Sequence, residues 1–327
     1  MYTKKLQLTH RDSLQNYHNL KQKLIHIAIK YLPDFILEKM KSAKKKMRNR
    51  ELQQQAENNK GYTQAYLESE LKKIGIQAGD HVLVHSALSK IGYINGGAQT
   101  LVNALLNVIT EKGTLLMPSF PASGRNKDYL ETLEAFDIKS TPSQMGKATE
   151  LFRQMSGVKR SFHPTDPVCA FGSEAEFFTN THFGEITPYT ENSPFRKLCT
   201  KNGKILMLGT TLNGAGTNLH TLEDAVEFKY PVYYEKIFEV KMIDATGAVS
   251  TMKTKVHNPI YSAKRNCDAL KPIFEKEKVL INGKIGEADT MLIDAQGMFD
   301  TMIAYYQQYG VTMYTPYGEH QQLKSNV

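Results

Sequence analysis

One stretch, residues 79–97, constrains the fold of this chain more than any other. It opens with a Gly-Asp turn and the short apolar run of residues 81–84, which is typical of a buried strand. Small hydroxyl and glycine residues follow. Apolar residues then recur at helical spacing up to Ile109, with Gly113 closing the helix. A strand, a small-residue loop and a helix form half of a βαβ unit. The stretch therefore predicts either a ligand-binding loop or an ordinary strand-to-helix connection.

The loop consists of residues that let a ligand approach the main chain closely. Where side chains are small, backbone N–H groups can donate hydrogen bonds to an anionic or thioester group. The residues of this kind are Ser86, Ser89, Gly92, Gly96 and Gly97.

The rest of the chain alternates strands and helices up to about residue 230. Hairpins are then expected, with turns at residues 244–247 and at Asn282-Gly283. This order indicates an α/β layered body with an appended antiparallel portion. A helix is expected to begin near Thr63. Residues 121–143 show little periodicity and are interpreted as a long loop, the kind that often serves as a functional lid.

Positive charge is confined to the N-terminal part of the chain. Residues 1–60 carry 14 Lys and Arg against 5 Asp and Glu, whereas the remaining residues carry 27 against 28. The net charge of +8 therefore comes from an arm, and the body is close to neutral. A nucleic-acid-binding domain needs positive charge on its folded surface, so no nucleic-acid partner is expected. We expect two parts, a basic amphipathic arm over residues 1–60 and a globular domain over residues 61–327.

The arm leaves two interpretations open. Residues 20–40 mix apolar residues with lysines and precede a basic run that ends at Arg50. An apolar face beside such a run is typical of a helix lying on a membrane surface, where each basic residue adds roughly 1 kcal/mol near anionic lipid. Residues 20–50 therefore predict either peripheral membrane contact or a helix that packs on the body or across a homo-oligomer. Residues 53–59 are polar and are expected to form a linker.

Cysteine usage and hydropathy favour a cytoplasmic protein, peripheral to the inner membrane face at most. Three scattered cysteines, Cys169, Cys199 and Cys267, form neither a metal set nor a disulfide framework and fit a reducing compartment. The first residues are polar and basic, without the apolar core of a signal peptide. The most apolar segment, residues 24–40, is interrupted by Pro33 and charged residues, so it cannot span a bilayer.

The best candidate for chemistry is His220 with Glu223. The two lie three residues apart on a predicted helix and so share a face, just after a glycine-rich loop that follows the apolar run 204–209. A histidine beside a carboxylate suits general base catalysis near neutral pH. The alternative is a structural histidine. No metal is expected, because a His-x-x-x-His pair and a cysteine pair are both absent.

Three further residues stand out less clearly. His163 precedes Pro164, where the chain must be extended, so a turn-stabilising role competes with catalysis. His182 is the other histidine whose position stands out. Cys169 lies in an apolar run and is expected in the core, since an acyltransferase thiol favours the start of a helix.

Several separate stretches, taken in order over residues 62–315, form one specific set. They are Val84-His-Ser-Ala-Leu-Ser89 with Gly92 and Gly96-Gly97, Gly113-Thr-Leu-Leu-Met-Pro118, Met145-Gly146, Arg160-Ser-Phe-His-Pro164 with Ala170 and Gly172, His182, Ser193-Pro194 with Leu198, residues 203–209, and Leu219-His-Thr-Leu-Glu223. This ordered set resembles the aminoglycoside 3-N-acetyltransferase family, also called the antibiotic N-acetyltransferase family. The N-terminal arm lies outside the resemblance.

The resemblance implies a three-layer α/β/α enzyme with a central mixed sheet. It implies transfer of an acyl group from acetyl-CoA, or another acyl-CoA, to the amino group of an amino sugar. The family's His-x-x-Glu motif falls on His220 and Glu223. Ala87 stands where the family often has a serine, which removes one donor to CoA, and Pro167 stands where it has another. The implied CoA-binding residues are His85, Ser86, Ala87, Leu88, Ser89, Gly92, Gly96 and Gly97.

Residues and resemblance together predict one mechanism and leave the acceptor open. His220 takes the proton of the amine while the amine attacks the thioester directly. The near-neutral body and the basic arm favour an amino sugar for a surface polysaccharide. The alternative is a polycationic aminoglycoside antibiotic, which acidic residues would attract locally. A non-catalytic CoA-binding or membrane scaffold is disfavoured by the intact His-x-x-Glu pair. The acidic residues are Glu185, Glu191, Glu223, Asp224 and Glu227.

Overall fold

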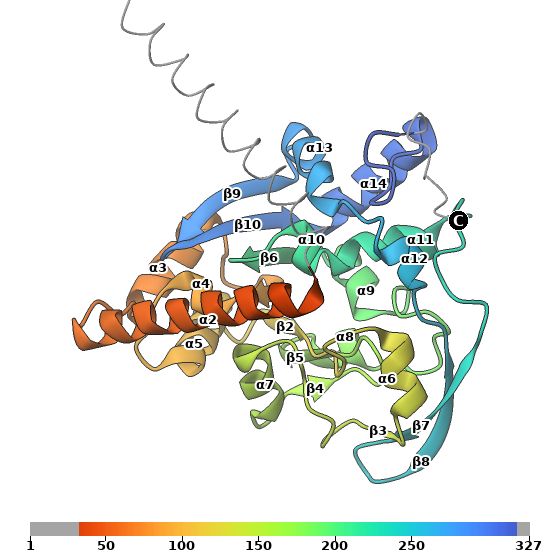
Figure 1. The fold of residues 1–327 in the computed structure, drawn as a ribbon, viewed down its shortest axis with the longest axis horizontal. Helices are drawn as coiled ribbons and strands as arrows, with labels where there is room; N and C mark the ends of the chain where they lie inside the picture. Colours follow the sequence, from red (N-terminus) through yellow and green to blue (C-terminus); the bar gives the residue numbers. More distant parts are fainter. Residues whose placement is uncertain (1–32, 319–327) are drawn as a thin grey trace, which may run out of the picture. The chain divides into compact units, whose positions relative to one another are not determined.

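The computed structural model describes residues 33–318 of the chain. The chain divides into two compact units, one that ends at Asn58 and one that begins at Asn59. The first contains helix α2 (Asp34–Glu57), and the second contains two β-sheets and the other described helices (Figure 1). Much of the predicted membrane-surface face falls on residues 20–32, outside the described residues.

Helix α2 is long and strongly charged. It runs unbroken to Glu57, so the linker predicted over residues 53–59 is wrong for most of its length. The Gln, Ala and Glu residues there are good helix formers, and a polar composition alone does not break a helix. Phe35 and Met47 are exposed, and the apolar residues of α2 do not gather on a single face. Within residues 33–318, no helix is long and apolar enough to cross a membrane.

The second unit is built around a seven-stranded sheet. Strand β1 (His81–Ser86) pairs in parallel with β2 (Thr114–Pro118) on one side and with β6 (Lys204–Leu208) on the other. The outer pairings are antiparallel, so the sheet is mixed, as predicted. The outer strands are β4 (Lys159–Arg160), β5 (Val168–Gly172), β9 (Leu280–Ile285) and β10 (Ala288–Asp294), and the strand order is β4-β5-β2-β1-β6-β10-β9.

Helices cover both faces of this sheet (Figure 1). Alternate residues of one strand enter different cores, because Leu83 packs in one core whereas Val82 and Val84 pack in the other. Burial on both faces explains why the strand is continuously apolar. The three-layer α/β/α prediction is confirmed. One core includes α3 (Gln64–Ile74), α5 (Gly97–Ile109) and α7 (Lys147–Gln154), and the other includes α8 (Ala175–Thr179), α9 (Pro194–Thr200), α13 (Lys271–Lys276) and α14 (Ala295–Tyr309).

Capping residues set several of the helix boundaries. Thr63 accepts a backbone hydrogen bond at the start of α3, and Gly75 ends that helix in the left-handed conformation. Ser193 caps α9 in the same way as Thr63 caps α3. Helix α5 ends at Ile109 and is capped by Thr110, which has a positive φ of 61°, so the predicted end at Gly113 is wrong. The other short elements are α4 (Leu88–Ile91), α10 (Leu212–Ala215), η1 (Thr217–His220), α11 (Thr221–Ala225), α12 (Pro259–Ser262) and η2 (Cys267–Leu270).

The prediction of a long loop over residues 121–143 is wrong, because part of this segment belongs to a second, three-stranded sheet. That segment contains α6 (Asn126–Thr132) and β3 (Phe136–Asp137), which pairs in parallel with β7 (Phe238–Ile243). Strand β8 (Val249–Thr254) completes the sheet through the predicted hairpin at residues 244–247. A strand of two residues shows no periodicity, so the sequence pattern could not reveal β3.

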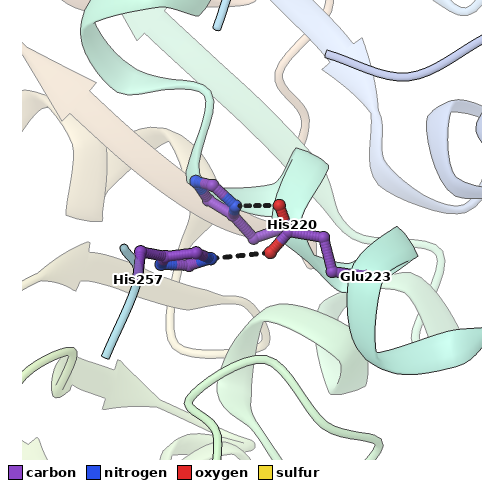
Figure 2. Close-up of side chains that lie close together, drawn as sticks. All are labelled: His220, Glu223 and His257. Carbon is purple, nitrogen blue, oxygen red and sulfur yellow. Dashed lines mark hydrogen bonds and ion pairs between the residues drawn. The ribbon is translucent and has the colours of Figure 1, made fainter. Parts of the chain in front are cut away.

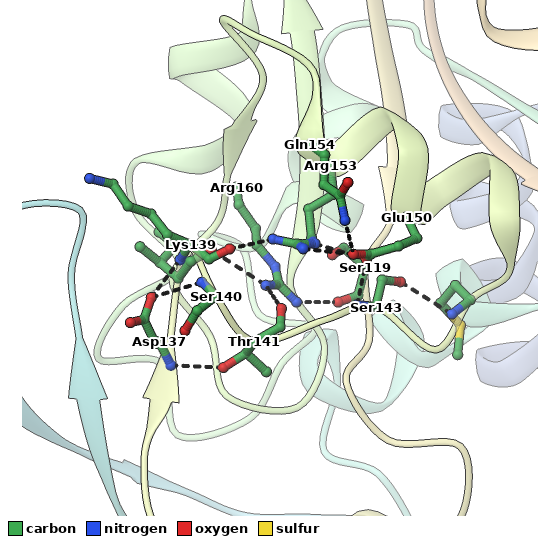
Figure 3. Close-up of polar contacts among 12 residues, drawn as sticks. Ser119, Asp137, Lys139, Ser140, Thr141, Ser143, Glu150, Arg153, Gln154 and Arg160 are labelled. Atoms are coloured by element: carbon green, nitrogen blue, oxygen red, sulfur yellow. Dashed lines mark hydrogen bonds and ion pairs between the residues drawn. The ribbon is translucent and has the colours of Figure 1, made fainter. Parts of the chain in front are cut away.

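Buried Arg160 fixes this segment against the main sheet (Figure 3). Its guanidinium donates to the carbonyl oxygens of Ser119 and Thr141, each at 2.6 Å. Farther along the segment, the backbone N–H of Ser143 donates to the carboxylate of Glu150 at 2.8 Å. The Arg160 side chain therefore supplies hydrogen bonds to backbone carbonyl groups that lie outside the regular strands and helices.

The second predicted hairpin exists, but its turn lies elsewhere. Strands β9 and β10 connect through Gly286-Glu287, and Gly286 has a positive φ of 59°. Asn282 and Gly283 pair within the ladder instead. A Cβ on Gly283 would lie 2.9 Å from Cδ1 of Ile74, so glycine here makes room for α3 and does not form a turn.

Candidate active site

The loops after β1, β2 and β6 lie at one edge of the central sheet, because the three strands are parallel. After β6 the chain passes through α10 and η1 into α11, and after β1 it enters α4. A hydrogen bond of 3.2 Å between Thr217 Oγ1 and His85 Nε2 joins the two connections. The predicted CoA-binding loop and the predicted base are therefore neighbours in space.

His220 and Glu223 face each other across two short helical segments (Figure 2). His220 is the last residue of the 3-10 helix η1, and Glu223 lies in α11, whereas the sequence predicts one helix for both. Nδ1 of His220 lies 3.0 Å from Oε1 of Glu223. A spacing of three residues brings side chains together in either helix type, so the predicted shared face is present.

Glu223 accepts hydrogen bonds from three side chains at a fully buried position. Besides His220, Nε2 of His257 donates to Oε2 at 2.7 Å, and the Tyr314 hydroxyl donates to Oε1 at 2.6 Å. Burial alone would raise the pKa of Glu223, but the two histidines and their hydrogen bonds outweigh it and hold that pKa well below its usual range. The carboxylate is therefore ionised and held in one orientation.

Arg265 shows which nitrogen of His220 carries the lone pair. Nη1 of Arg265 lies 2.8 Å from Nε2 of His220. A guanidinium only donates, so Nε2 accepts, and the proton on Nδ1 is donated to Glu223. Burial lowers the pKa of His220 to about 4, against the opposing effect of Glu223, so the ring is neutral near pH 7. A neutral imidazole with a lone pair on Nε2 is the form that a general base requires.

Aromatic rings and two further carboxyl groups surround this pair. The Tyr189 ring stacks on His220 at 4.9 Å, and its hydroxyl donates to Asp166 at 2.8 Å. The Tyr233 hydroxyl donates to Asp224 at 3.3 Å. Burial raises the pKa of Asp166, and it raises the pKa of Asp224 to about 6. Sequence reasoning missed Asp166, Tyr189 and Tyr233, because they come from separate loops, whereas Asp224 is one of the acidic residues expected near the site.

A pocket of about 640 Å³ beside α11 carries negative charge. Glu185, Glu191 and Asp224 line it together with Arg196. Three of the five acidic residues expected to gather do line one pocket, whereas Glu223 is buried beneath its three donors.

His220, Glu223 and His257 form the one group of three within residues 33–318 with potential metal-ligand atoms close together, all within 4.8 Å of one another. The hydrogen bonds argue against a metal ion there. Both histidine nitrogens that face Glu223 carry protons, and a ligand nitrogen must offer a lone pair instead. The contacts fit a hydrogen-bonded base, and the absence of a metal stays a prediction.

The predicted CoA-binding residues form a short structured connection. His85 and Ser86 end β1, Ala87 precedes α4, which contains Leu88 and Ser89, and Gly92, Gly96 and Gly97 all have positive φ. A Cβ on Gly92 would meet the Tyr62 ring at 2.6 Å, whereas nothing lies within 4 Å of a Cβ on Gly97. Gly97 therefore faces open space at the start of α5, where Gln99 lines a pocket of about 680 Å³.

The remaining candidates have structural surroundings. His163 and His182 are fully buried, and their rings stack at 4.5 Å. Nδ1 of His163 accepts hydrogen bonds of 3.3 Å from the backbone N–H groups of Thr165 and Asp166, which is the turn-stabilising arrangement. Cys169 is fully buried, and burial raises the pKa of its thiol to about 11, which does not suit a nucleophile.

Comparisons with known proteins agree with this architecture. The YokD protein of Bacillus subtilis (strain 168), an SPbeta prophage-derived aminoglycoside N(3')-acetyltransferase-like protein, is 35% identical over 191 residues, which cover 54% of this chain and 67% of that protein. Aminoglycoside N(3)-acetyltransferase III of Salmonella sp is 28% identical over 280 residues, 78% of this chain and 95% of that protein. The solved structure of aminoglycoside acetyltransferase AAC(3)-Xa has the same fold, with a TM-score of 0.69 and 23% identity over 80% of this chain and 98% of that chain.

A sequence profile extends the match over most of the folded body. The profile described as aminoglycoside 3-N-acetyltransferase matches residues 83–307. The protein is therefore an acyltransferase by class. More narrowly, this chain belongs to the aminoglycoside 3-N-acetyltransferase family.

Proposed function

We propose that this protein transfers the acetyl group of acetyl-CoA to an amino group of an aminoglycoside. The observation that carries the proposal is the buried His220–Glu223 pair, whose Nε2 lone pair is available to an acceptor amine once Arg265 moves away. Among the relatives, AAC-IIIb has been solved as a binary complex with CoASH, and AAC-VIa has been solved bound to sisomicin. Those complexes support the choice of donor and acceptor.

The acceptor differs from the one that overall charge favours. Nothing in the relatives supports an amino sugar for a surface polysaccharide, whereas their names support an aminoglycoside. Aminoglycosides are polycations, and the pocket lined by Glu185, Glu191 and Asp224 offers local negative charge. The balance of charge over the whole body therefore misleads, because a substrate responds to the charges near the site.

The reaction proceeds by direct attack. The neutral amine donates a hydrogen bond to Nε2 of His220, and its nitrogen lone pair forms a bond to the thioester carbonyl carbon while the carbonyl π electrons move to oxygen. Nε2 takes the amine proton, and the ionised Glu223 stabilises the imidazolium that results. The tetrahedral intermediate then expels the CoA thiolate, which receives the proton from His220. No cysteine nucleophile is needed.

Release of free thiol from acetyl-CoA tests the proposal. Wild-type protein is assayed with gentamicin, sisomicin and apramycin, and in parallel with a nucleotide-linked amino sugar. We expect thiol release with at least one aminoglycoside. In His220→Gln, kcat should fall by about 10²–10⁴-fold with unchanged acetyl-CoA affinity by calorimetry. Exposed Glu111, in the turn before β2, provides a control, since Glu111→Gln should keep kcat.

Each part of the proposal can fail separately. Thiol release with the nucleotide-linked sugar alone would overturn the acceptor. Near-normal turnover in a folded His220→Gln protein would overturn the base. Tight acetyl-CoA binding without thiol release for any acceptor would indicate the non-catalytic scaffold.

A further inference from the structure

The contact between Arg265 and His220 conflicts with catalysis as it stands. A general base must lie within hydrogen-bond distance of the proton it removes. Nε2 of His220 already receives a hydrogen bond of 2.8 Å from Nη1 of Arg265. The guanidinium does not lose its proton in proteins, so it cannot relay one. It therefore occupies the place of the acceptor amine, and each turnover requires it to move.

The surroundings of Arg265 allow this movement. Its side chain is half-buried, and Nε donates to the carbonyl oxygen of Ser262 at 3.3 Å. Within residues 33–318, no carboxylate forms an ion pair with it at 4.0 Å or less. Arg265 belongs to the short connection between α12 and η2, so the segment that carries it is not part of a regular element. A guanidinium held by one imidazole and one carbonyl can be displaced by an incoming donor.

The thioester oxygen needs a hydrogen-bond donor near the place from which the guanidinium is displaced. As the amine attacks, the thioester oxygen gains negative charge while the amine remains hydrogen-bonded to Nε2. A donor aimed at that oxygen is often the largest single contribution to such a reaction. The carboxylate of Glu223 is already occupied by three donors and repels the oxygen. Arg265 is the charged donor in direct contact with the base.

We infer that Arg265 is a catalytic residue, which caps His220 before the acceptor binds and then donates to the thioester oxygen in the transition state. The inference rests on the proposed acetyl transfer. The acceptor amine takes the hydrogen bond of Nε2, the guanidinium moves to the oxygen, and it returns to Nε2 when products leave. No proton passes through Arg265 at any step.

The test compares Arg265→Gln and Arg265→Lys with wild-type protein, using Lys264→Gln as the matched control. Lys264 is the neighbouring cation and lies over the ring of Tyr261, so its loss removes charge from the same segment without touching His220. In Arg265→Gln, kcat should fall by about 10²–10³-fold with little change in the KM for acetyl-CoA. Arg265→Lys should recover part of the loss, and Lys264→Gln should keep wild-type kcat.

A donor analogue locates the interaction on the oxygen. With the dithioester analogue of acetyl-CoA, in which sulfur replaces the carbonyl oxygen, the hydrogen bond is weaker, so the penalty of Arg265→Gln should shrink by at least about tenfold. An equal penalty with both donors, or a kcat that is unchanged or higher in folded Arg265→Gln, overturns the inference. The second result would make Arg265 only a block on the base.

A measurement without turnover separates this inference from the proposed function. Histidine ¹⁵N chemical shifts, assigned to His220 through His220→Gln, report its tautomer and pKa in the free enzyme. Removing the guanidinium should raise the pKa of His220 and move the acidic limb of kcat/KM to higher pH. If wild-type protein acetylates no aminoglycoside but this pKa still rises, the proposed function fails while the contact stands. If the pKa does not move, the contact itself is absent.

Discussion

Replacing Glu223 by glutamine removes one negative charge from beneath the base while keeping the shape of the side chain. The amide oxygen can still accept from Nδ1 of His220 and from the Tyr314 hydroxyl at the Oε1 position. The amide nitrogen then faces Nε2 of His257, which can accept after a change of tautomer. The tautomer of His220 therefore survives, and the main loss is the stabilisation of the imidazolium that forms during attack.

The expected magnitude follows from the geometry. Nδ1 of His220 and Oε1 of Glu223 are 3.0 Å apart, which places the two charge centres about 4 Å apart. At an effective dielectric constant of about 20, unit charges at that distance interact by about 4 kcal/mol. A difference of about 1.4 kcal/mol changes a rate tenfold. We therefore expect kcat of Glu223→Gln to fall by about 10³-fold.

Thiol release at saturating acetyl-CoA measures this loss, and calorimetry should show unchanged acetyl-CoA affinity. A thermal melt checks the fold, and we expect a stability near that of wild type because a buried charge is removed along with its pairing. The charge-matched control is again Glu111→Gln at an exposed position. A loss below about tenfold in folded Glu223→Gln would refute the view that Glu223 stabilises the imidazolium.

Three further predictions concern the cofactor loop, the buried histidines and the arm. Gly97 and Gly79 both have positive φ, and a Cβ added at either position would meet open space. Alanine at either position should therefore lower the free energy of unfolding by about 1–2 kcal/mol. Calorimetry should show weaker acetyl-CoA binding for Gly97→Ala and unchanged binding for Gly79→Ala. Burial lowers the pKa of His85 to about 4 and that of His182 to about 3, so the folded state binds fewer protons than the unfolded state. Urea unfolding should show stability falling as pH drops from 6.5 toward 4, by about 3 kcal/mol for His85, with a shallower slope in His182→Gln. The excess positive charge of residues 1–60 should make the full chain co-sediment with anionic vesicles at low salt, and salt at about 1 M should release it. Protein that stays in the supernatant at low salt would contradict this prediction.

Local elements could be predicted from the sequence wherever a short-range signal was strong. The apolar run at residues 81–84 predicts a buried strand, and the caps at Thr63 and Ser193 predict two helix starts. The spacing of His220 and Glu223 predicts their contact, because three residues make about one helical turn whether the helix is α or 3-10. These signals depend only on neighbouring residues, so they can be interpreted without the fold.

Where packing decides the structure, local sequence signals favour arrangements that the fold does not contain. Asn282-Gly283 favours a turn, but Ile74 packs against Gly283 and the turn moves to Gly286-Glu287. Strand β3 is too short to show a pattern, and Arg160 supplies the contacts that hold its segment. Overall charge favoured a polysaccharide sugar, and only the fold shows that Glu185, Glu191 and Asp224 line one pocket.

How the base works became visible only in the tertiary structure. His257 and Tyr314 reach Glu223 from 34 and 91 residues away, and Arg265 reaches His220 from 45 residues away. No spacing rule connects residues so far apart, because their meeting depends on sheet order and on the loops that follow each strand. The residues of the pair could therefore be found in the sequence, whereas its tautomer, its charge and the arginine that covers its lone pair are set by the fold.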